Sequence, residues 1–154
     1  MLKKTFTLII LFFLSSCGYE AIHSKKNSVN YNFSIGELSF IGDRDINLKI
    51  KEKLNNYTLT KKNKNFDLKI SSSTDRAILA KDTSGNPTSF KSAIIINIEV
   101  LMKNELKNSF KIVEYFNYNN ISNKFDLKKY EREIKINLAE TATDKLIFKL
   151  SNIQ

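Results

Sequence analysis

The sequence predicts an α+β domain in two layers, with the element order β-α-β-β-β-α. Three observations predict this fold: long stretches of alternating apolar and polar residues, two amphipathic helical stripes, and one strong turn signal between two of the alternating stretches. A two-layer sandwich is expected, in which a mainly antiparallel four-stranded sheet packs against two helices. The chain has 154 residues and 42 % apolar content, which suits one domain with a packed core.

The first strand and the first helix are expected near the start of the domain. Apolar residues occupy every second position from residue 29, so a half-buried strand should run over 29–40 and end at Gly42. A helix over 46–56 should follow, since three apolar residues four apart place one apolar face on it. Asp43 or Asp45 is expected to cap this helix.

The middle of the chain predicts a hairpin of long strands. Residues 66–80 alternate, residues 81–89 (KDTSGNPTS) carry the strongest turn signal, and residues 94–102 alternate again. The second alternating stretch is the expected central strand, and Ile96 is predicted to lie in the core. Residues 103–105 can form a turn, which leads to a fourth strand expected over 110–118. The large apolar residues of that strand, Val113, Tyr115 and Phe116, occupy both odd and even positions. This pattern predicts a bulge or burial on two faces.

The last predicted element is a helix over 126–152. Its apolar stripe has spacings of three and four and most simply covers the sheet, although a helix that binds a partner or a membrane surface would share the pattern. Glu131 and Lys135 stand at the favourable i,i+4 order for an ion pair. The stripe consists of Leu127, Tyr130, Ile134, Leu138, Ala142, Leu146, Leu150 and Ile153.

The N-terminus has the three regions of a bacterial lipoprotein signal peptide, expected over residues 1–16. Two lysines precede a short apolar run, and residues 14–17 (LSSC) resemble the lipobox that ends such signals. The run is too short for a comfortable membrane span, which needs about 20 apolar residues. The chain's single cysteine, Cys17, is therefore the expected lipidation site. The alternative is a signal anchor in which this cysteine is incidental.

The predicted mature chain would begin at Cys17 and hold to a membrane through its acyl chains. Residues 17–28 are expected to be an acylated N-terminus and tether, followed by the folded domain over 29–154. Gly18, rather than aspartate, follows the cysteine, which favours the periplasmic face of the outer membrane. With its one cysteine acylated, the chain has no disulfide to form.

The composition argues against an enzyme. The single histidine, His23, lies in the tether, and the chain lacks the spacing of a metal site or a phosphate-binding glycine loop, so neither a metal nor a cofactor is expected. The formal charge is +9, but the lysines are scattered and no aromatic-basic module accompanies them. Nucleic acid is therefore not an expected partner.

Taken in order, these features resemble the LptE family of LPS-assembly lipoproteins, particularly its α-proteobacterial version. The resemblance rests on residues 17–22 (CGYEAI), on 42–44 (GDR) before the first helix, and on the turn at 82–85 (DTSG). It continues through 115–125 (YFNYNNISNKF) into a last helix containing LAE at 138–140. The similarity covers almost the whole mature chain.

The resemblance implies a non-enzymatic outer-membrane lipoprotein that plugs the β-barrel LptD, helps it assemble, and assists delivery of lipopolysaccharide to the cell surface. The alternative is another outer-membrane lipoprotein acting as an envelope or barrel-assembly accessory. Lipid A carries phosphates, and cations near the central turn could bind them. The candidates are Arg76, Lys81 and Lys91, and the competing interpretation is that they are solvated charges that discourage strand-edge aggregation.

Overall fold

The computed structural model describes residues 32–153 of the chain. The predicted signal peptide (1–16), the lipidation site Cys17 and the tether (17–28) lie outside the described residues, and so do the first three positions of the predicted first strand. Within the described part, the structure confirms the predicted α+β fold. The elements follow the predicted order β-α-β-β-β-α, with one added turn of 3-10 helix after the first helix.

The sheet has four strands in the order β1-β2-β3-β4, matching their order in the chain. Their bounds are Phe33–Gly42, Lys64–Lys81, Pro87–Met102 and Glu105–Asn119. The β2–β3 and β3–β4 pairs are antiparallel, whereas β1 pairs with β2 in parallel. A parallel pair needs a crossover between its strands, and the helix between β1 and β2 supplies it.

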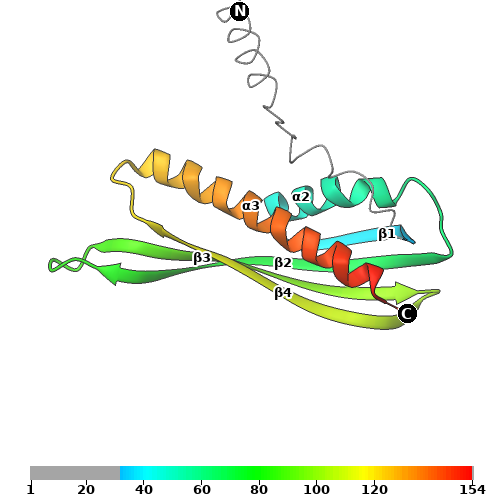
Figure 1. The fold of residues 1–154 in the computed structure, drawn as a ribbon. Coiled ribbons are helices and arrows are strands. Elements are labelled where there is room, and N and C mark those ends of the chain that lie inside the picture. Colours follow the sequence, from blue (N-terminus) through cyan, green and yellow to red (C-terminus); the bar gives the residue numbers. More distant parts are fainter. Residues whose placement is uncertain (1–31, 154) are drawn as a thin grey trace, which may run out of the picture. The chain divides into compact units, whose positions relative to one another are not determined.

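Both helices pack on one face of the sheet. Helix α2 spans Arg44–Leu54 and continues into the 3-10 turn η1, Asn55–Tyr57, while α3 spans Lys124–Ser151. Asp43 caps α2, as one of the two predicted candidates, and Asn123 caps α3 through its side chain. Figure 1 shows α3 crossing the sheet along most of its length, with α2 beside it above β1.

The core lies between the two helices and the part of the sheet that they cover. Ile96 on β3 and Leu138 on α3 are buried, as predicted, with 1 % and 9 % of their surface exposed. All the buried residues of α3 lie from Ile134 onward, so its first turns contribute no fully buried side chain to this core. The predicted stripe is therefore too long, because Tyr130 is 36 % exposed.

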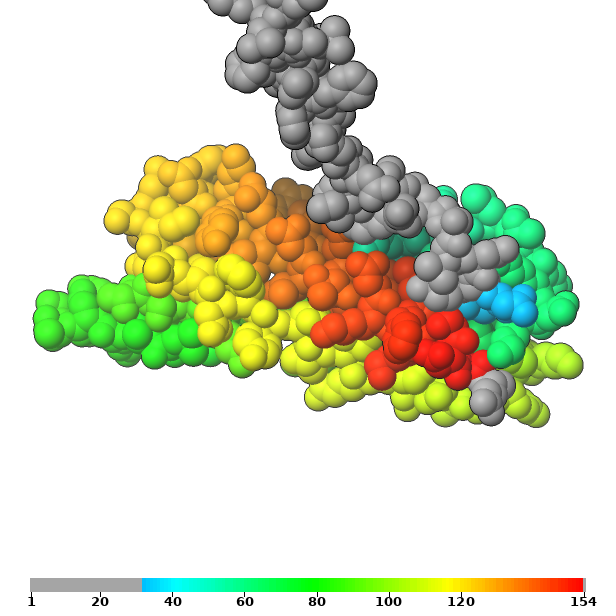
Figure 2. All heavy atoms as spheres, in the orientation of Figure 1, coloured from blue at the N-terminus to red at the C-terminus, as the bar shows by residue number. Residues whose placement is uncertain are grey.

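Beyond the core, β2 and β3 continue as a hairpin arm, here defined as residues 73–91. Every residue of β2 from Ser73 to Lys81 is exposed, whereas alternate residues before Ser73 are buried. Figure 2 shows the end of the arm as a narrow projection beyond the first turns of α3. The turn at its tip is held by Asp82, whose carboxylate accepts hydrogen bonds from the backbone of Ser84 and Asn86.

Strand β4 differs from its prediction. The strand is not buried on two faces: Val113, Tyr115 and Phe116 are 48 %, 60 % and 45 % exposed. Its pairing with β3 is regular beside these residues, and the register shift lies instead between Val100 and Leu101. Apolar residues occupy both odd and even positions because both faces carry them: Phe116 lies on the helix-facing side with Ile112, and Val113 and Tyr115 lie on the open side. Alternation alone does not reveal whether a face is covered.

Candidate functional site

The arm and the adjoining part of β4 expose apolar side chains on both faces of the sheet. Ile78 and Leu79 on the arm are 49 % and 50 % exposed. Tyr115 pairs with Ala93 and Phe116 with Ser92, so the exposed residues of β4 flank the root of the arm. Large apolar side chains gathered on an otherwise polar surface are typical of sites that another molecule covers. This region is the first candidate interaction surface.

Arg76 lies at the root of the arm, on the face toward the helices. Its Nε lies 2.9 Å from Oε1 of Glu131 on α3, and also donates a hydrogen bond of 3.1 Å to the hydroxyl of Tyr118. The guanidinium carbon lies 3.8 Å from the ring centroid of Phe90. Tyr118 donates in turn to Glu131, and its ring meets Tyr130 edge-on. We call these five residues the aromatic clamp.

The clamp raises the pKa of two of its members, Arg76 and Tyr118. The hydrogen bond to Tyr118 and the carboxylate of Glu131 raise the pKa of Arg76, so the guanidinium stays charged. Burial, together with the hydrogen bond to Glu131, raises the pKa of the Tyr118 hydroxyl. The clamp holds the first half of α3 to the arm where the apolar core no longer does so. Because its side chain is 48 % exposed, Arg76 can still meet an anion.

The structure does not bring the three predicted lipopolysaccharide-binding cations together. Arg76 pairs with Ser92, while Lys91 pairs with Ala77, and neighbouring residues of a strand point to opposite faces. Lys91 therefore lies on the open face, with its ammonium 4.2 Å from the ring centroid of Tyr115. Lys81 is exposed at the last residue of β2. A single phosphate between Arg76 and Lys91 is excluded, because the sheet separates them.

A polar cleft separates the first half of α3 from the sheet. Three members of the clamp line it, namely Arg76, Tyr118 and Glu131, and so do Asp45 and Lys135 of a second charged cluster. In that cluster the ammonium of Lys135 lies 3.1 Å from a carboxylate oxygen of Asp43 and 3.0 Å from one of Asp45. The hydrogen bond from Lys135 lowers the pKa of Asp45. Burial alone would lower the pKa of Lys135, but the bonds to both carboxylates outweigh it and raise that pKa.

These contacts replace the ion pair predicted within α3. Glu131 bonds to Arg76 and Lys135 to the start of α2, so each partner of the expected i,i+4 pair binds another element instead. A helical spacing shows which side chains are neighbours, but here each side chain makes its contact with a partner on another element. The sequence offered one signal for Glu131, its place beside the apolar stripe.

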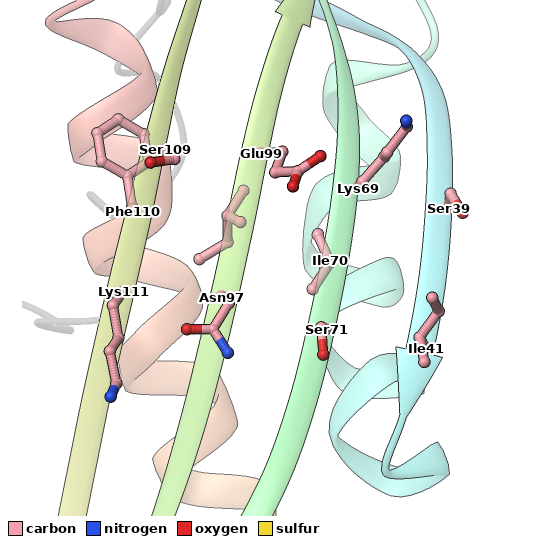
Figure 3. A pocket seen from close by; sticks show the side chains of 11 residues that line it. Ser39, Ile41, Lys69, Ile70, Ser71, Asn97, Glu99, Ser109, Phe110 and Lys111 are labelled. Carbon is pink, nitrogen blue, oxygen red and sulfur yellow. The ribbon is translucent and has the colours of Figure 1, made fainter. Parts of the chain in front are cut away.

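The open face of the sheet carries a second candidate surface, a shallow hollow across all four strands. Figure 3 shows Lys69, Asn97 and Lys111 arising from three adjacent strands around it. The hollow has a volume of about 400 Å³. Its lining offers hydrogen-bond donors and acceptors, with both signs of charge. The other polar residues around it are Ser39, Ser71, Glu99 and Ser109.

Two kinds of feature are absent from the part of the chain that the structure describes. Within residues 32–153, no His, Cys, Asp and Glu side chains group in a way that could hold a metal ion. Over the same residues, no helix has the length and apolar content required to cross a membrane. The exposed surfaces of this part of the chain carry hydrogen-bonding groups and apolar side chains.

Comparison with solved structures places this fold among bacterial lipoprotein domains. Rare lipoprotein B from Shewanella oneidensis superposes with a TM-score of 0.55 at 15 % identity, covering 74 % of this chain and 96 % of that one. The minor lipoprotein from Acinetobacter baumannii gives 0.57 at 12 %, covering 79 % and 91 %. Lipoprotein B from Nitrosomonas europaea gives 0.52 at 13 %, covering 82 % and 89 %.

These likenesses establish a shared fold. No family model matches the sequence, and no curated protein matches it. The chain thus has the fold of these lipoprotein domains at a sequence identity of 11–15 % for those with TM-scores above 0.5.

Proposed function

We propose that this chain is an outer-membrane lipoprotein that plugs the LptD β-barrel, helps it assemble, and assists lipopolysaccharide delivery, without enzymatic activity. The observation that carries the proposal is the combination of a lipobox at Cys17 with a fold shared with rare lipoprotein B. Cys17 would bear the acyl chains, including palmitate, that hold the chain to the membrane. The LptE-like order of motifs supplies the particular partner.

The surface of the domain supports a binding role inside a larger protein. A plug in a barrel meets a polar lumen, so it needs a rigid body with a hydrogen-bonding exterior. The open face of the sheet supplies such an exterior over four strands. The exposed apolar side chains at the root of the arm would then contact loops or the inner wall at one level, where water is excluded.

The proposed contact with lipopolysaccharide is spread along the arm. Arg76 and Lys91 lie on opposite faces, so each would meet a different anionic group. Binding should be compared for the wild type, Arg76→Ser, and the double variant Lys81→Ser with Lys91→Ser, at low and high salt. Weaker, less salt-dependent binding by the variants supports the contact. Equal binding by all three proteins removes the arm from lipopolysaccharide recognition.

Purification of the intact lipoprotein from membranes in mild detergent tests the main proposal. A large β-barrel that co-purifies in stoichiometric amount supports the plug. Peptidoglycan or other lipoproteins in its place would support the alternative, an envelope or barrel-assembly accessory. Tyr115→Asp should weaken barrel recovery, because Tyr115 is 60 % exposed on the candidate surface. Lys124→Asp, at an exposed position on the first turn of α3, is the control.

The anchor has its own test. Cys17→Ala removes the thiol that would accept the lipid, so the precursor should stay uncleaved and take up no label from an acyl probe. Labelling or normal processing of this variant would overturn the lipobox interpretation. The fold comparisons would be unaffected, since they rest on the domain.

A further inference from the structure

At one end of the domain, the start of β1 lies beside a basic loop. We call this the entry end: the first residues of β1, the loop 58–63, and the β3–β4 turn. Phe33 pairs with Lys64, and the backbone N–H of Lys62 donates to the hydroxyl of Ser34 at 3.0 Å. The ring of Phe33 also stacks on Tyr57 with centroids 5.0 Å apart. The loop is therefore held beside the residue through which the chain leads back to Cys17.

The entry end is positively charged. Between Glu52 and Asp67 the sequence has four lysines and no acidic residue. One of them, Lys53, is paired with Asp144, but Lys61 is exposed at the end of the loop. Lys103 is also exposed, in the β3–β4 turn at the same end of the sheet in Figure 1.

Among the described residues, neither Lys61 nor Lys103 forms an ion pair. Glu105, which follows the β3–β4 turn, lies 3.0 Å from the ammonium of Lys107 instead. The carboxylate of Asp67 accepts the backbone N–H of Glu37 at 2.8 Å and keeps its negative charge. Exposed lysines that no carboxylate pairs with attract an anionic surface.

An exposed leucine accompanies these charges. Leu59 is 74 % exposed in the loop, between the stacked Tyr57 and the lysines. Burying such a side chain in a membrane interface is favourable, and lysines can reach the headgroups around it. The loop thus combines an apolar side chain with cations on one surface.

The predicted tether keeps this end near a bilayer. Asn32 follows Cys17 by 32 − 17 = 15 residues, which span at most about 50 Å when fully extended. Strand β2 alone has 18 residues and is about 60 Å long, so the tip of the arm lies farther from the entry end than the tether can reach. The anchor therefore favours contact of the entry end, rather than the arm, with the membrane.

We propose that the entry end docks on an anionic phospholipid surface, with Leu59 in the interface and Lys61 and Lys103 at the phosphates. This inference rests on the lipid anchor of the proposed function and adds an orientation: the entry end faces the bilayer and the arm points away from it. A plug held in that orientation would present its arm to the far side of the barrel.

The test uses the full lipidated chain in vesicles of phosphatidylcholine with and without phosphatidylglycerol. The chain has no tryptophan, so Leu59→Trp introduces a single indole whose emission reports on its surroundings. Phe125→Trp is the matched control, since Phe125 is also 74 % exposed but lies at the start of α3. The Leu59→Trp indole should shift to the blue and be quenched by brominated lipid in the anionic vesicles, while the control should not respond.

Charge variants complete the test. Lys61→Gln with Lys103→Asn, made in the Leu59→Trp chain, should lower the equilibrium constant for docking by about fivefold for each lysine removed. Asparagine suits position 103, because the backbone φ there is 53°. Lys128→Gln with Lys129→Gln, at exposed positions of α3, should change nothing. Raising salt to 1 M shortens the screening length to about 3 Å and should mimic the loss of the lysines.

Two results would overturn the inference: equal responses from the two indoles, or a response of Leu59→Trp that ignores anionic lipid and salt. The vesicles contain no barrel. Failure here is therefore distinct from failure to recover a barrel with the intact lipoprotein, which would count against the plug and not against the orientation.

Discussion

The base of the domain, where the helices cover the sheet, and the hairpin arm both contain strands β2 and β3. Different interactions stabilise the two regions. In the base, alternate side chains of β2 and β3 pack under both helices, and the side chain of Ile96 is only 1 % exposed. On the arm, Ile78 lies on the same side of the sheet but is 49 % exposed, because no helix covers it fully. A strand can therefore persist without a core when its ladder continues from a packed one.

The junction between the two regions is polar and aromatic. In the first turns of α3, which have no fully buried side chain, the ion pair and hydrogen bonds among Arg76, Tyr118 and Glu131 connect the helix to the sheet. Hydrogen bonds and half-exposed ion pairs contribute less than apolar burial. The comparison therefore indicates a stable base and an arm that opens more readily.

The largest expected difference comes from the same substitution in the two regions. Ile96→Ala should lower the free energy of unfolding by about 2–5 kcal/mol, because it leaves a cavity in the base. Ile78→Ala should change it by about 0.5 kcal/mol or less, because the side chain is already half exposed. Urea denaturation measures both. Equal losses would show that the arm is packed like the base.

Two glycines give a second contrast, in the backbone. Gly42 has a φ of 99°, and a Cβ there would lie 1.9 Å from the carbonyl oxygen of Ser72. Gly42→Ala should cost about 1–3 kcal/mol for the backbone alone, and the contact with Ser72 adds to it. Gly85, with a φ of 85° in the turn of the arm, has nothing within 4 Å. Gly85→Ala should therefore cost less in thermal denaturation, and the reverse order would contradict this description of the two turns.

The clamp offers a smaller effect. Tyr118→Phe removes the hydroxyl shared by Arg76 and Glu131 and should cost about 0.5–1.5 kcal/mol. Amide exchange should rise in the first half of α3 more than in its second half, because only the first half depends on the clamp. Tyr115→Phe, on the open face, is the control and should leave exchange unchanged. Uniform exchange along α3 would argue against a separate junction.

The smallest effect concerns pH. The lowered pKa of Asp45 means that its pair with Lys135 contributes stability above about pH 4, and that this contribution is lost as the pH falls through the folded pKa. The raised pKa of Lys135 means a second loss, as the pH rises through the folded pKa of the lysine. For a partly exposed pair, each loss should be at most about 1 kcal/mol.

Lys135→Met tests this assignment. The variant should flatten the acid limb of the stability profile measured by urea denaturation, because Asp45 then loses the partner that depresses its pKa. An unchanged acid limb would assign the pH dependence to other carboxylates.

The element order, most of the strand and helix spans, a cap at Asp43 or Asp45 and the burial of Ile96 and Leu138 all follow from the sequence, while the structure selects Asp43 as the cap. These features are readable because the periods of two and 3.6 residues, turn residues and caps are local properties of a chain. The lipobox at Cys17 is equally local, and it remains a prediction from the sequence.

The parallel pairing of β1 with β2, the bare arm, and the separation of Arg76 from Lys91 emerged only from the folded chain. Each depends on which distant element lies over a given side chain. Periodicity identifies the face to which a residue belongs, but it carries no information about what covers that face. Glu131 shows the consequence: its local spacing favours Lys135, while the packing of α3 on the sheet brings it to Arg76.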